Sequence, residues 1–259
     1  QVGDGSAISA ITGLPVISDF RLLDVALYGQ GAPLVPIGDQ KLFGEYDFCL
    51  NLGGFANIST EKDGKRIAFD IAPCNIALNR IARNLGESYD DGGQMAARGS
   101  IQYELLKELD ALPFYQDFKP KSMGREWVNS EFWPIVRGFD QEGVSQENLM
   151  KTLVDHIAGQ IADSIEHFSG SEVASKRVLI TGGGAYNTTL IEHLKSHCDA
   201  QMIVPEDGKL IEYKEALIFA FLGALRLRQE ENTLASVTGA KSNSIGGAMW
   251  GNFNRILND

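Results

Sequence analysis

Two glycine clusters stand where strand-like runs end. Gly53-Gly54 follows the apolar run Tyr46–Leu52, and Gly182-Gly183-Gly184 separates the run VLIT from the helix-like segment TLIEHLKSH. A glycine turn between a strand and a helix exposes backbone N–H groups and the positive end of the helix, which favour phosphate. Each cluster alone is more often a structural turn, and neither matches GxGxxG or the Gly-Lys-Ser/Thr phosphate loop. Together they make nucleotide binding a hypothesis.

Asp70 is the main candidate for a catalytic carboxylate. It closes the strand-like segment Arg66–Asp70, two residues before the rigid Ala72-Pro73 step. Phosphoryl transfer needs one carboxylate to orient and deprotonate the attacking group. A carboxylate that caps the following turn would give the same pattern, so both interpretations stay open. Asp19 and Asp24, in DFRLLD, carry the same ambiguity.

For several other polar residues, a structural role is an alternative to a functional one. The stretch Lys119-Pro120-Lys121-Ser122, with Arg125 beyond it, could hold phosphate, although a solvated basic loop is the more common case. His193 and His197 lie four residues apart on one predicted helix. Because no glutamate completes an HExxH pattern, we interpret them as surface residues without a metal. Cys74 is interpreted as a small buried residue.

The predicted elements place these residues on an α/β fold, a mixed sheet covered by helices. We expect a short helix and a strand before residue 21, then a loop-rich segment to Gly44, where glycine and proline recur. A β-meander follows, with a hairpin turn at Asp63-Gly64. The remaining predicted elements are helices over 75–84, 101–112, 145–168, from 188 and over 215–228, and strands at 178–181 and 201–204.

Composition limits the partners. The formal net charge of −11 disfavours nucleic acid or an anionic membrane as the main partner, and no apolar run reaches the roughly 20 residues of a membrane span. The three cysteines are few and far apart, which fits a reducing compartment, so we predict a cytoplasmic protein. The chain begins QVGDG without a methionine, and we expect a fragment or a processed chain.

Several motifs in fixed order carry a resemblance to a known family. The sequence contains DFRLLDVALYGQGAPLVP, LNLGGFANIS, FDIAPCN, YDDGG, PKSMGRE, TGGGAYN, KEALIFAFLGAL and SVTGA. This series resembles the anhydro-N-acetylmuramic acid kinases over nearly the whole chain. The resemblance implies the fold of the sugar kinase, actin and chaperone superfamily, with two ribonuclease-H-like domains around a nucleotide cleft. Residues 1–45 would complete the amino-terminal domain and the sugar side, and residues 46–259 would form the nucleotide-binding domain.

The resemblance also implies an activity. Members of the family use ATP and Mg²⁺, add water across the 1,6-anhydro ring of the cell-wall recycling sugar and phosphorylate its O6. The product would be N-acetylmuramic acid 6-phosphate, and the resemblance further implies a homodimer. Non-catalytic nucleotide binding, or a kinase for another sugar, remain the alternatives.

Site residues follow from the matched motifs. Asp70 matches the family general base that activates water. The sugar side would include Asp19, Arg21, Gln30 and Asn75. Glu215 matches a family glutamate, although a first-turn helix acid is an alternative. The phosphates would contact Gly53, Gly54 and Asn57, and the nucleoside would contact Gly182, Gly183, Gly184 and Asn187.

The sequence departs from the family at several places. Where the family reads FDTGPGN, this chain has Ile71, Ala72 and Cys74, and Tyr28 replaces a usual glycine. Nothing matches the family's first phosphate loop, GTSxDG. We therefore expect the chain to be the carboxyl-terminal portion of such a kinase and to be inactive alone.

Overall fold

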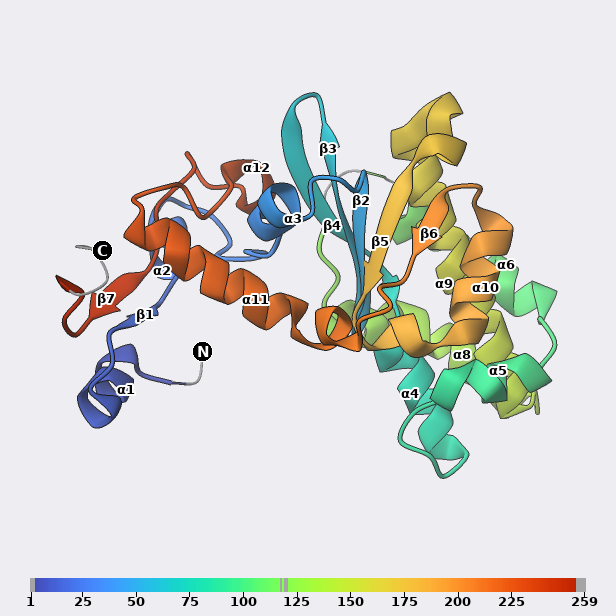
Figure 1. Cartoon of the computed structure of the whole chain (residues 1–259). Helices are drawn as coiled ribbons and strands as arrows, with labels where there is room; N and C mark the ends of the chain where they lie inside the picture. Colours follow the sequence, from blue (N-terminus) through green and yellow to red (C-terminus); the bar gives the residue numbers. More distant parts are fainter. Residues whose placement is uncertain (1–2, 117, 119–120, 255–259) are drawn as a thin grey trace. The chain divides into compact units, whose positions relative to one another are not determined.

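A computed structural model describes residues 3–116, 118 and 121–254 (Figure 1). The described chain forms two compact units. Unit 1 contains the residues up to Gly44, Asp63–Ile67 and the residues from Tyr213 onward, and unit 2 contains Glu45–Lys62 and Ala68–Glu212. None of the described helices combines the length and the apolar character that a membrane span requires.

A five-stranded mixed sheet is the centre of unit 2 (Figure 1). Its order is β4-β3-β2-β5-β6, where β2 is antiparallel to β3 and parallel to β5, and β5 is parallel to β6. This is the strand order of a ribonuclease-H-like sheet, and it confirms the predicted fold class. The strands are β2 (Phe48–Leu52), β3 (Phe55–Lys62), β4 (Lys65–Pro73), β5 (Arg177–Thr181) and β6 (Gln201–Ile203).

The central strand β2 is buried on both faces. Phe48, Cys49, Leu50 and Leu52 are each at most 2% exposed, which explains why its sequence is nearly continuously apolar. The turn from β3 to β4 confirms the predicted hairpin. Asp63 and Gly64 both have positive φ, +51° and +72°, as the twist of a two-residue hairpin requires.

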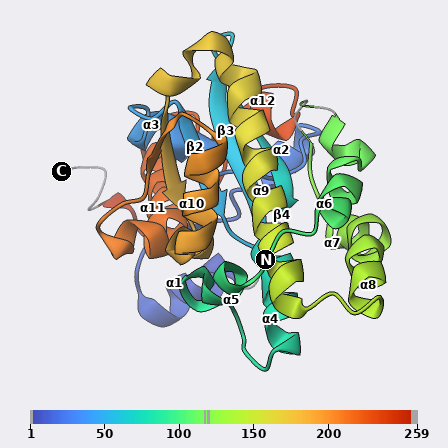
Figure 2. The ribbon, with the colours of Figure 1, turned by 90° about the vertical axis from the view of Figure 1, so that its right-hand side faces the viewer.

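One long helix organises the helical layer of unit 2. Helix α9 contacts β3 and packs against α4, α5, α6 and α10, and Figure 2 shows α9 and α10 in front of the sheet. The hydroxyl of Ser145 accepts a hydrogen bond from the N–H of Asn148, which confirms the predicted N-cap. The helices are α4 (Asn75–Asn84), α5 (Gln94–Arg98), α6 (Tyr103–Asp110), α7 (Arg125–Trp127), α8 (Trp133–Gln141), α9 (Gln146–Ser169) and α10 (Thr188–His197). Short 3₁₀ or π turns occupy Asp91–Gly93, Pro113–Gln116, Val128–Phe132, Gly170–Ser175 and Gly183–Tyr186.

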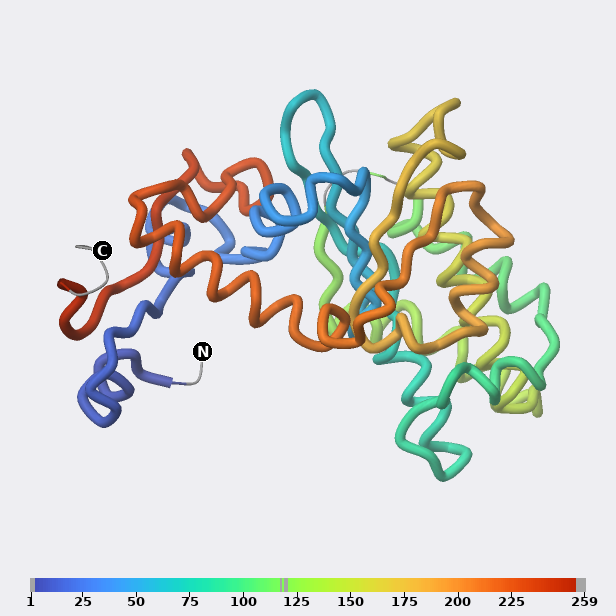
Figure 3. Tube along the Cα trace, in the orientation of Figure 1, coloured from blue at the N-terminus to red at the C-terminus, as the bar shows by residue number. Residues whose placement is uncertain are grey.

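Unit 1 joins the two ends of the described chain. Strand β1 runs beside β7 near the two ends of the described chain (Figure 3), and the two pair antiparallel. In this pairing Val16 lies opposite Trp250. This pairing explains why the residues from Tyr213 group with unit 1, whereas the predicted domains kept them with residues 46–212. The elements are α1 (Gly5–Thr12), β1 (Val16–Ser18), α2 (Leu22–Ala26), α3 (Pro36–Leu42), most of α11 (Gly208–Leu227), α12 (Ala235–Thr238) and β7 (Ala248–Trp250).

The prediction of a loop-rich segment from Arg21 to Gly44 was correct only in part, because helices α2 and α3 form within it and a loop remains between them. Pro36 is the first residue of α3. Proline begins helices well, since its φ is already helical and its missing N–H would have no partner there.

Asp24 is a structural residue of unit 1. Its carboxylate is fully buried and accepts hydrogen bonds from the N–H of Gly31 (2.8 Å) and the hydroxyl of Thr238 (2.6 Å). A Cβ added to Gly29 would lie 2.2 Å from Asp24 Oδ2. The glycine at position 29 therefore lets the loop close over this carboxylate. Of the two interpretations of Asp24, the structural one agrees with these contacts.

A buried ion pair joins α3 to α11. The ammonium of Lys214 lies 2.7 Å from Asp39 Oδ1, both side chains are less than 10% exposed, and Lys214 also lies over the ring of Phe43. Burying two charges is unfavourable unless they stay together, so each needs its partner.

We expect Lys214→Ala to lower the free energy of unfolding by about 3–5 kcal/mol, because it removes one member of a buried ion pair. The midpoint of urea unfolding measures this. Arg228→Ala is the control, since Arg228 pairs with Glu230 in the exposed part of unit 1. Equal shifts for the two variants would contradict a special role for the buried pair.

Candidate functional site

The first glycine turn is tied to the start of helix α4. The carbonyl oxygen of Gly54 accepts hydrogen bonds from the N–H groups of Cys74 (2.9 Å) and Ile76 (3.1 Å), and that of Gly53 accepts one from Asn75 (3.1 Å). The side chain of Asn75 donates to the carbonyl of Leu52 (3.0 Å). The β2–β3 turn and the end of FDIAPCN are thus one rigid assembly.

The second glycine cluster packs against the same strand end. A Cβ added to Gly182, whose φ is +82°, would lie 2.5 Å from Asn51 Oδ1 and 2.9 Å from the Leu52 carbonyl oxygen. One added to Gly184 would lie 2.7 Å from Leu52 Cβ. At Gly182 and Gly184 neighbouring protein atoms therefore leave no room for a side chain. The sequence had suggested instead that a bound ligand requires the bare backbone of this turn.

Gly183 and Gly54 are different. Both are exposed, a Cβ on Gly54 would meet nothing within 4 Å, and a Cβ on Gly183 would meet only Asn75 Nδ2 at 3.8 Å. Bare backbone from the two predicted phosphate and nucleoside segments thus lies at the same end of the sheet, with Asn75 between them. Such a cradle suits a phosphorylated ligand.

We expect Gly182→Ala and Gly184→Ala to destabilise the protein by about 1–3 kcal/mol each, because the added methyl overlaps the end of β2. Gly183→Ala should leave the midpoint of urea unfolding nearly unchanged. A comparable loss of stability at all three positions would contradict this division.

The two asparagines predicted at the nucleotide have structural contacts. Asn57 lies opposite Asn51 in the β2–β3 pair. Asn187 is 6% exposed and caps α10, since its Oδ1 accepts the N–H of Leu190 at 2.9 Å. Their roles at a nucleotide stay predictions.

Asp70 lies inside β4, which continues to Pro73, so its expected place at the end of the strand was wrong. Its N–H donates to the carbonyl of Lys121 (2.9 Å), and its Oδ2 accepts the N–H of Met123 (2.8 Å). Among the described residues no donor contacts Oδ1. Burial raises the pKa of this half-buried carboxyl group, and the Met123 hydrogen bond opposes the shift. Within the described part of the chain, Oδ1 is therefore available to accept a proton.

The basic stretch near Asp70 is partly described. Lys119 and Pro120 lie outside the described residues. The ammonium of Lys121 contacts the carbonyl and the ring of Phe114, and the main chain at Lys121 and Met123 holds Asp70. In this segment these two hydrogen bonds with Asp70 come from backbone groups of Lys121 and Met123, not from a charged side chain.

A basic hollow of about 550 Å³ adjoins the first glycine turn. Gly54 and Asn75 line it together with Arg80, Arg83 and Arg125, and no acidic side chain is among its described lining residues. Arg80 lies over the ring of Trp133 at 4.0 Å. Burial, and secondarily the charge of Arg137, lower the pKa of Arg80. The hollow was not predicted from the sequence, although Arg80 and Arg83 are three residues apart and therefore share one face of α4.

The other predicted sugar-side residues lie in unit 1, not in unit 2 with Asp70 and Asn75. Asp19 has φ +60° and accepts the hydroxyl of Ser18 (2.9 Å), and Arg21 Nη1 donates to the carbonyl of Gly31 (2.6 Å). Gln30 is exposed, and its backbone N–H donates to Thr238. Glu215 is exposed inside α11, which begins at Gly208, so its interpretation as a first-turn acid was wrong.

Two departures from the family pattern have visible consequences. Tyr28 adopts a φ of +70°, a backbone conformation that favours glycine. This explains why the family usually has glycine at this position. Cys74 is fully buried, and burial raises the pKa of its thiol to about 12. This confirms Cys74 as a buried residue and excludes it as a thiolate nucleophile at neutral pH.

The fold and the site define a class: an α/β protein with a ribonuclease-H-like sheet, whose glycine turns present bare backbone beside a basic hollow and a carboxylate. Comparison with known proteins gives the family. The family described as "Anhydro-N-acetylmuramic acid kinase" matches residues 1–252. The chain belongs to the anhydro-N-acetylmuramic acid kinase family, as its motifs predicted.

Curated relatives agree. A protein named anhydro-N-acetylmuramic acid kinase from Coxiella burnetii (strain Dugway 5J108-111) is 36% identical over 261 residues, which cover 97% of this chain and 69% of the relative. One of the same name from Pseudomonas fluorescens (strain Pf0-1) is 36% identical over 259 residues, covering 97% and 70%. Both are named as kinases, and this agrees with the predicted sugar kinase.

Solved structures are more distant. The activator of the 2-hydroxyisocaproyl-CoA dehydratase from Clostridium difficile with bound ADPNP has a TM-score of 0.46 at 14% identity, covering 76% of this chain and 67% of that one. Component A of the (R)-2-hydroxyglutaryl-CoA dehydratase of Acidaminococcus fermentans has a TM-score of 0.39 at 12% identity, covering 71% and 63%.

Proposed function

We propose that this protein acts in the ATP-dependent conversion of 1,6-anhydro-N-acetylmuramic acid to N-acetylmuramic acid 6-phosphate, a step of peptidoglycan recycling in the cytoplasm. The observation that carries the proposal is the half-buried Asp70 carboxylate, which accepts a backbone N–H on Oδ2 and meets no donor from the described residues on Oδ1. Membership of the kinase family supports the substrate.

Asp70 is the general base in this proposal. Its Oδ1 takes a proton from water as the water oxygen bonds to C1 of the sugar. The bond from C1 to O6 breaks, and O6 takes the γ-phosphoryl group of ATP, leaving ADP. Burial favours this role, because the raised pKa makes the carboxylate a stronger base than an exposed aspartate.

The phosphates would lie against Gly53, Gly54 and Asn57, and the nucleoside against Gly182–Gly184 and Asn187. The open backbone at Gly54 and Gly183 fits such a ligand. Mg²⁺ would supply charge neutralisation on the phosphates when bound. Asn75, Asp19, Arg21, Gln30 and Glu215 are the sugar-binding residues of the proposal, and a homodimer remains part of it.

We expect Asp70→Asn to lower kcat by about 10²–10⁴-fold, because an amide cannot accept the proton from water. The measurement is ADP release with 1,6-anhydro-N-acetylmuramic acid, on the 259-residue chain and on the full product of its gene. Calorimetry should give an unchanged Kd for ATP. Asp63→Asn, an exposed aspartate in the β3–β4 turn, is the control.

Two outcomes would contradict this role. One is an equal loss of ATP affinity in Asp70→Asn, which would make Asp70 part of the nucleotide site. The other is the pH profile. Because the base must be ionised, we expect kcat/KM to fall as the pH is lowered through a pKa above that of an ordinary aspartate. A profile flat down to the usual aspartate range would exclude Asp70 as the base.

The basic hollow suits the lactyl carboxylate of the muramic sugar. We expect Arg83→Ala to raise KM for this sugar roughly tenfold with kcat nearly unchanged, because it removes charged hydrogen bonds from binding alone. Arg98→Ala, on α5, is the control. Turnover of 1,6-anhydro-N-acetylglucosamine, which lacks the carboxylate, should not change, and an equal effect on both sugars would refute the assignment.

The alternatives predict other results. A non-catalytic nucleotide-binding module would bind ATP and release no ADP with any anhydro sugar, in the chain or in the full gene product. A kinase for another sugar would turn over a different substrate and still depend on Asp70.

A further inference from the structure

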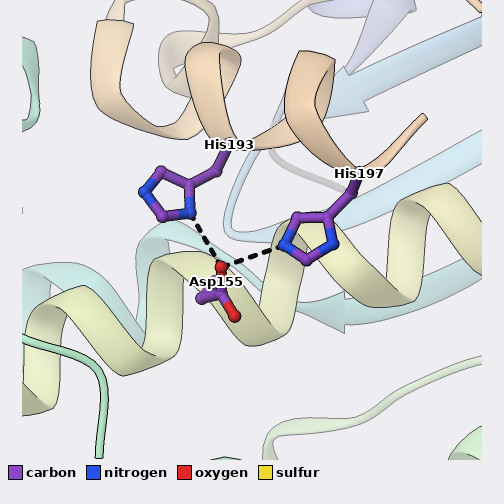
Figure 4. Close-up of side chains that lie close together, drawn as sticks. All are labelled: Asp155, His193 and His197. Atoms are coloured by element: carbon purple, nitrogen blue, oxygen red, sulfur yellow. Dashed lines mark hydrogen bonds and ion pairs between the residues drawn. The ribbon is translucent and has the colours of Figure 1, made fainter. Parts of the chain in front are cut away.

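Three side chains meet between helices α9 and α10 of unit 2 (Figure 4). His193 Nδ1 lies 2.8 Å and His197 Nε2 lies 2.9 Å from the same oxygen, Oδ1 of Asp155. One ligand-type atom from each residue lies within 4.8 Å of the others. The sequence predicted two surface histidines without a metal, and His197 is exposed. Their shared contact with Asp155 was not visible in the sequence, because this third residue comes from another helix.

The helices fix this arrangement. His193 and His197 are one turn apart on α10 and therefore share a face. Asp155 lies on α9, which packs along α10. The Asp155 side chain is 10% exposed, and those of His193 and His197 are 17% and 37% exposed. The cluster is thus rigid at its base and open to solvent on one side.

The chemistry of the cluster is that of a transition-metal site. Two imidazole nitrogens and one carboxylate oxygen suit Zn²⁺ and similar divalent ions and leave a fourth position for water. In a tetrahedral site with bonds of about 2.0–2.2 Å, ligand atoms lie roughly 3.4 Å apart. Each histidine nitrogen would need to move about half an ångström away from Asp155 Oδ1 to reach this separation.

The surroundings favour a cation. Asp155 and His197 line a hollow of about 410 Å³ together with Asp110 and Asp163, and no lysine or arginine is among its described lining residues. Burial, followed by the charge of Asp110, raises the pKa of Asp163. A bound cation would relieve this repulsion, and the hollow gives it a path and room for a water ligand.

Lys151 opposes the metal. Its ammonium lies 2.7 Å from His193 Nε2. With Nδ1–H of His193 donating to Asp155, Nε2 accepts from Lys151. A metal on Nδ1 would move the proton to Nε2, where it would face the donors of Lys151, so the lysine must swing away. The structure therefore contains both a ligand set and a competitor.

We propose that Asp155, His193 and His197 form a binding site for a divalent transition metal of the Zn²⁺ class, which links α10 to α9. The site is independent of the kinase activity proposed above.

The test is a Zn²⁺ titration of the whole 259-residue chain against a chromogenic chelator, with the visible spectrum of bound Co²⁺ as a second readout. His193→Gln and His197→Gln should each weaken Zn²⁺ at least tenfold and remove the spectrum of bound Co²⁺. His167→Gln is the matched control, because that histidine stacks on Phe118 outside the cluster. Equal affinity of all four proteins would overturn the proposal, since the bound metal would then be adventitious.

Lys151→Gln gives an opposite and independent expectation. The glutamine carbonyl can accept Nε2–H of His193 and orient the ring, and such outer contacts change metal affinity by about 10–100-fold. Zn²⁺ should therefore bind at least tenfold more tightly to Lys151→Gln than to the unsubstituted chain. This gain cannot result from misfolding, and an unchanged or weaker affinity would refute the assignment.

Discussion

The candidate site depends on one close contact, the approach of three segments to the end of strand β2. Leu52 receives the side chain of Asn75 on its carbonyl oxygen, and Gly182 and Gly184 pack against its backbone and Cβ. No side chain fits at those two glycines. This contact sets the position of Gly54 and Gly183, whose exposed backbone is what a phosphorylated ligand would meet. The cluster TGGGAYN thus serves packing first, and only its middle glycine is free for recognition.

The electrostatics of unit 2 are local. The whole chain carries a formal charge of −11, yet the hollow beside Gly54 is lined by three arginines. The hollow beside Asp155 and His197 has the opposite character, because Asp110 and Asp163 also line it and its described lining includes no lysine or arginine. Net charge therefore describes neither site, because short-range donors and acceptors decide what each can bind. Asp70 follows the same rule, since its basicity comes from burial rather than from a charged neighbour.

Buried polar groups also order unit 1. The Asp24 carboxylate accepts hydrogen bonds from Gly31 and Thr238, and Asp39 forms an ion pair with Lys214. These buried carboxylates therefore connect residues that lie far apart in the sequence. Asp24 and Asp70 are both acids in apolar-rich runs, and they are indistinguishable by pattern. Their difference is the number of donors that reach each carboxylate.

The sequence by itself determined the family, the mixed α/β class, the hairpin at Asp63-Gly64 and the Ser145 cap, because motif order, apolar periodicity and turn chemistry are local properties. It also selected Asp70 and both glycine turns. Only the tertiary structure decided which glycines are packed and which are free, that Arg80, Arg83 and Arg125 line one hollow, and that Asp155 joins His193 and His197. It also formed α2 and α3 in a segment rich in glycine and proline. These outcomes depend on contacts between residues distant in sequence, and such contacts leave no periodic signal in a single chain.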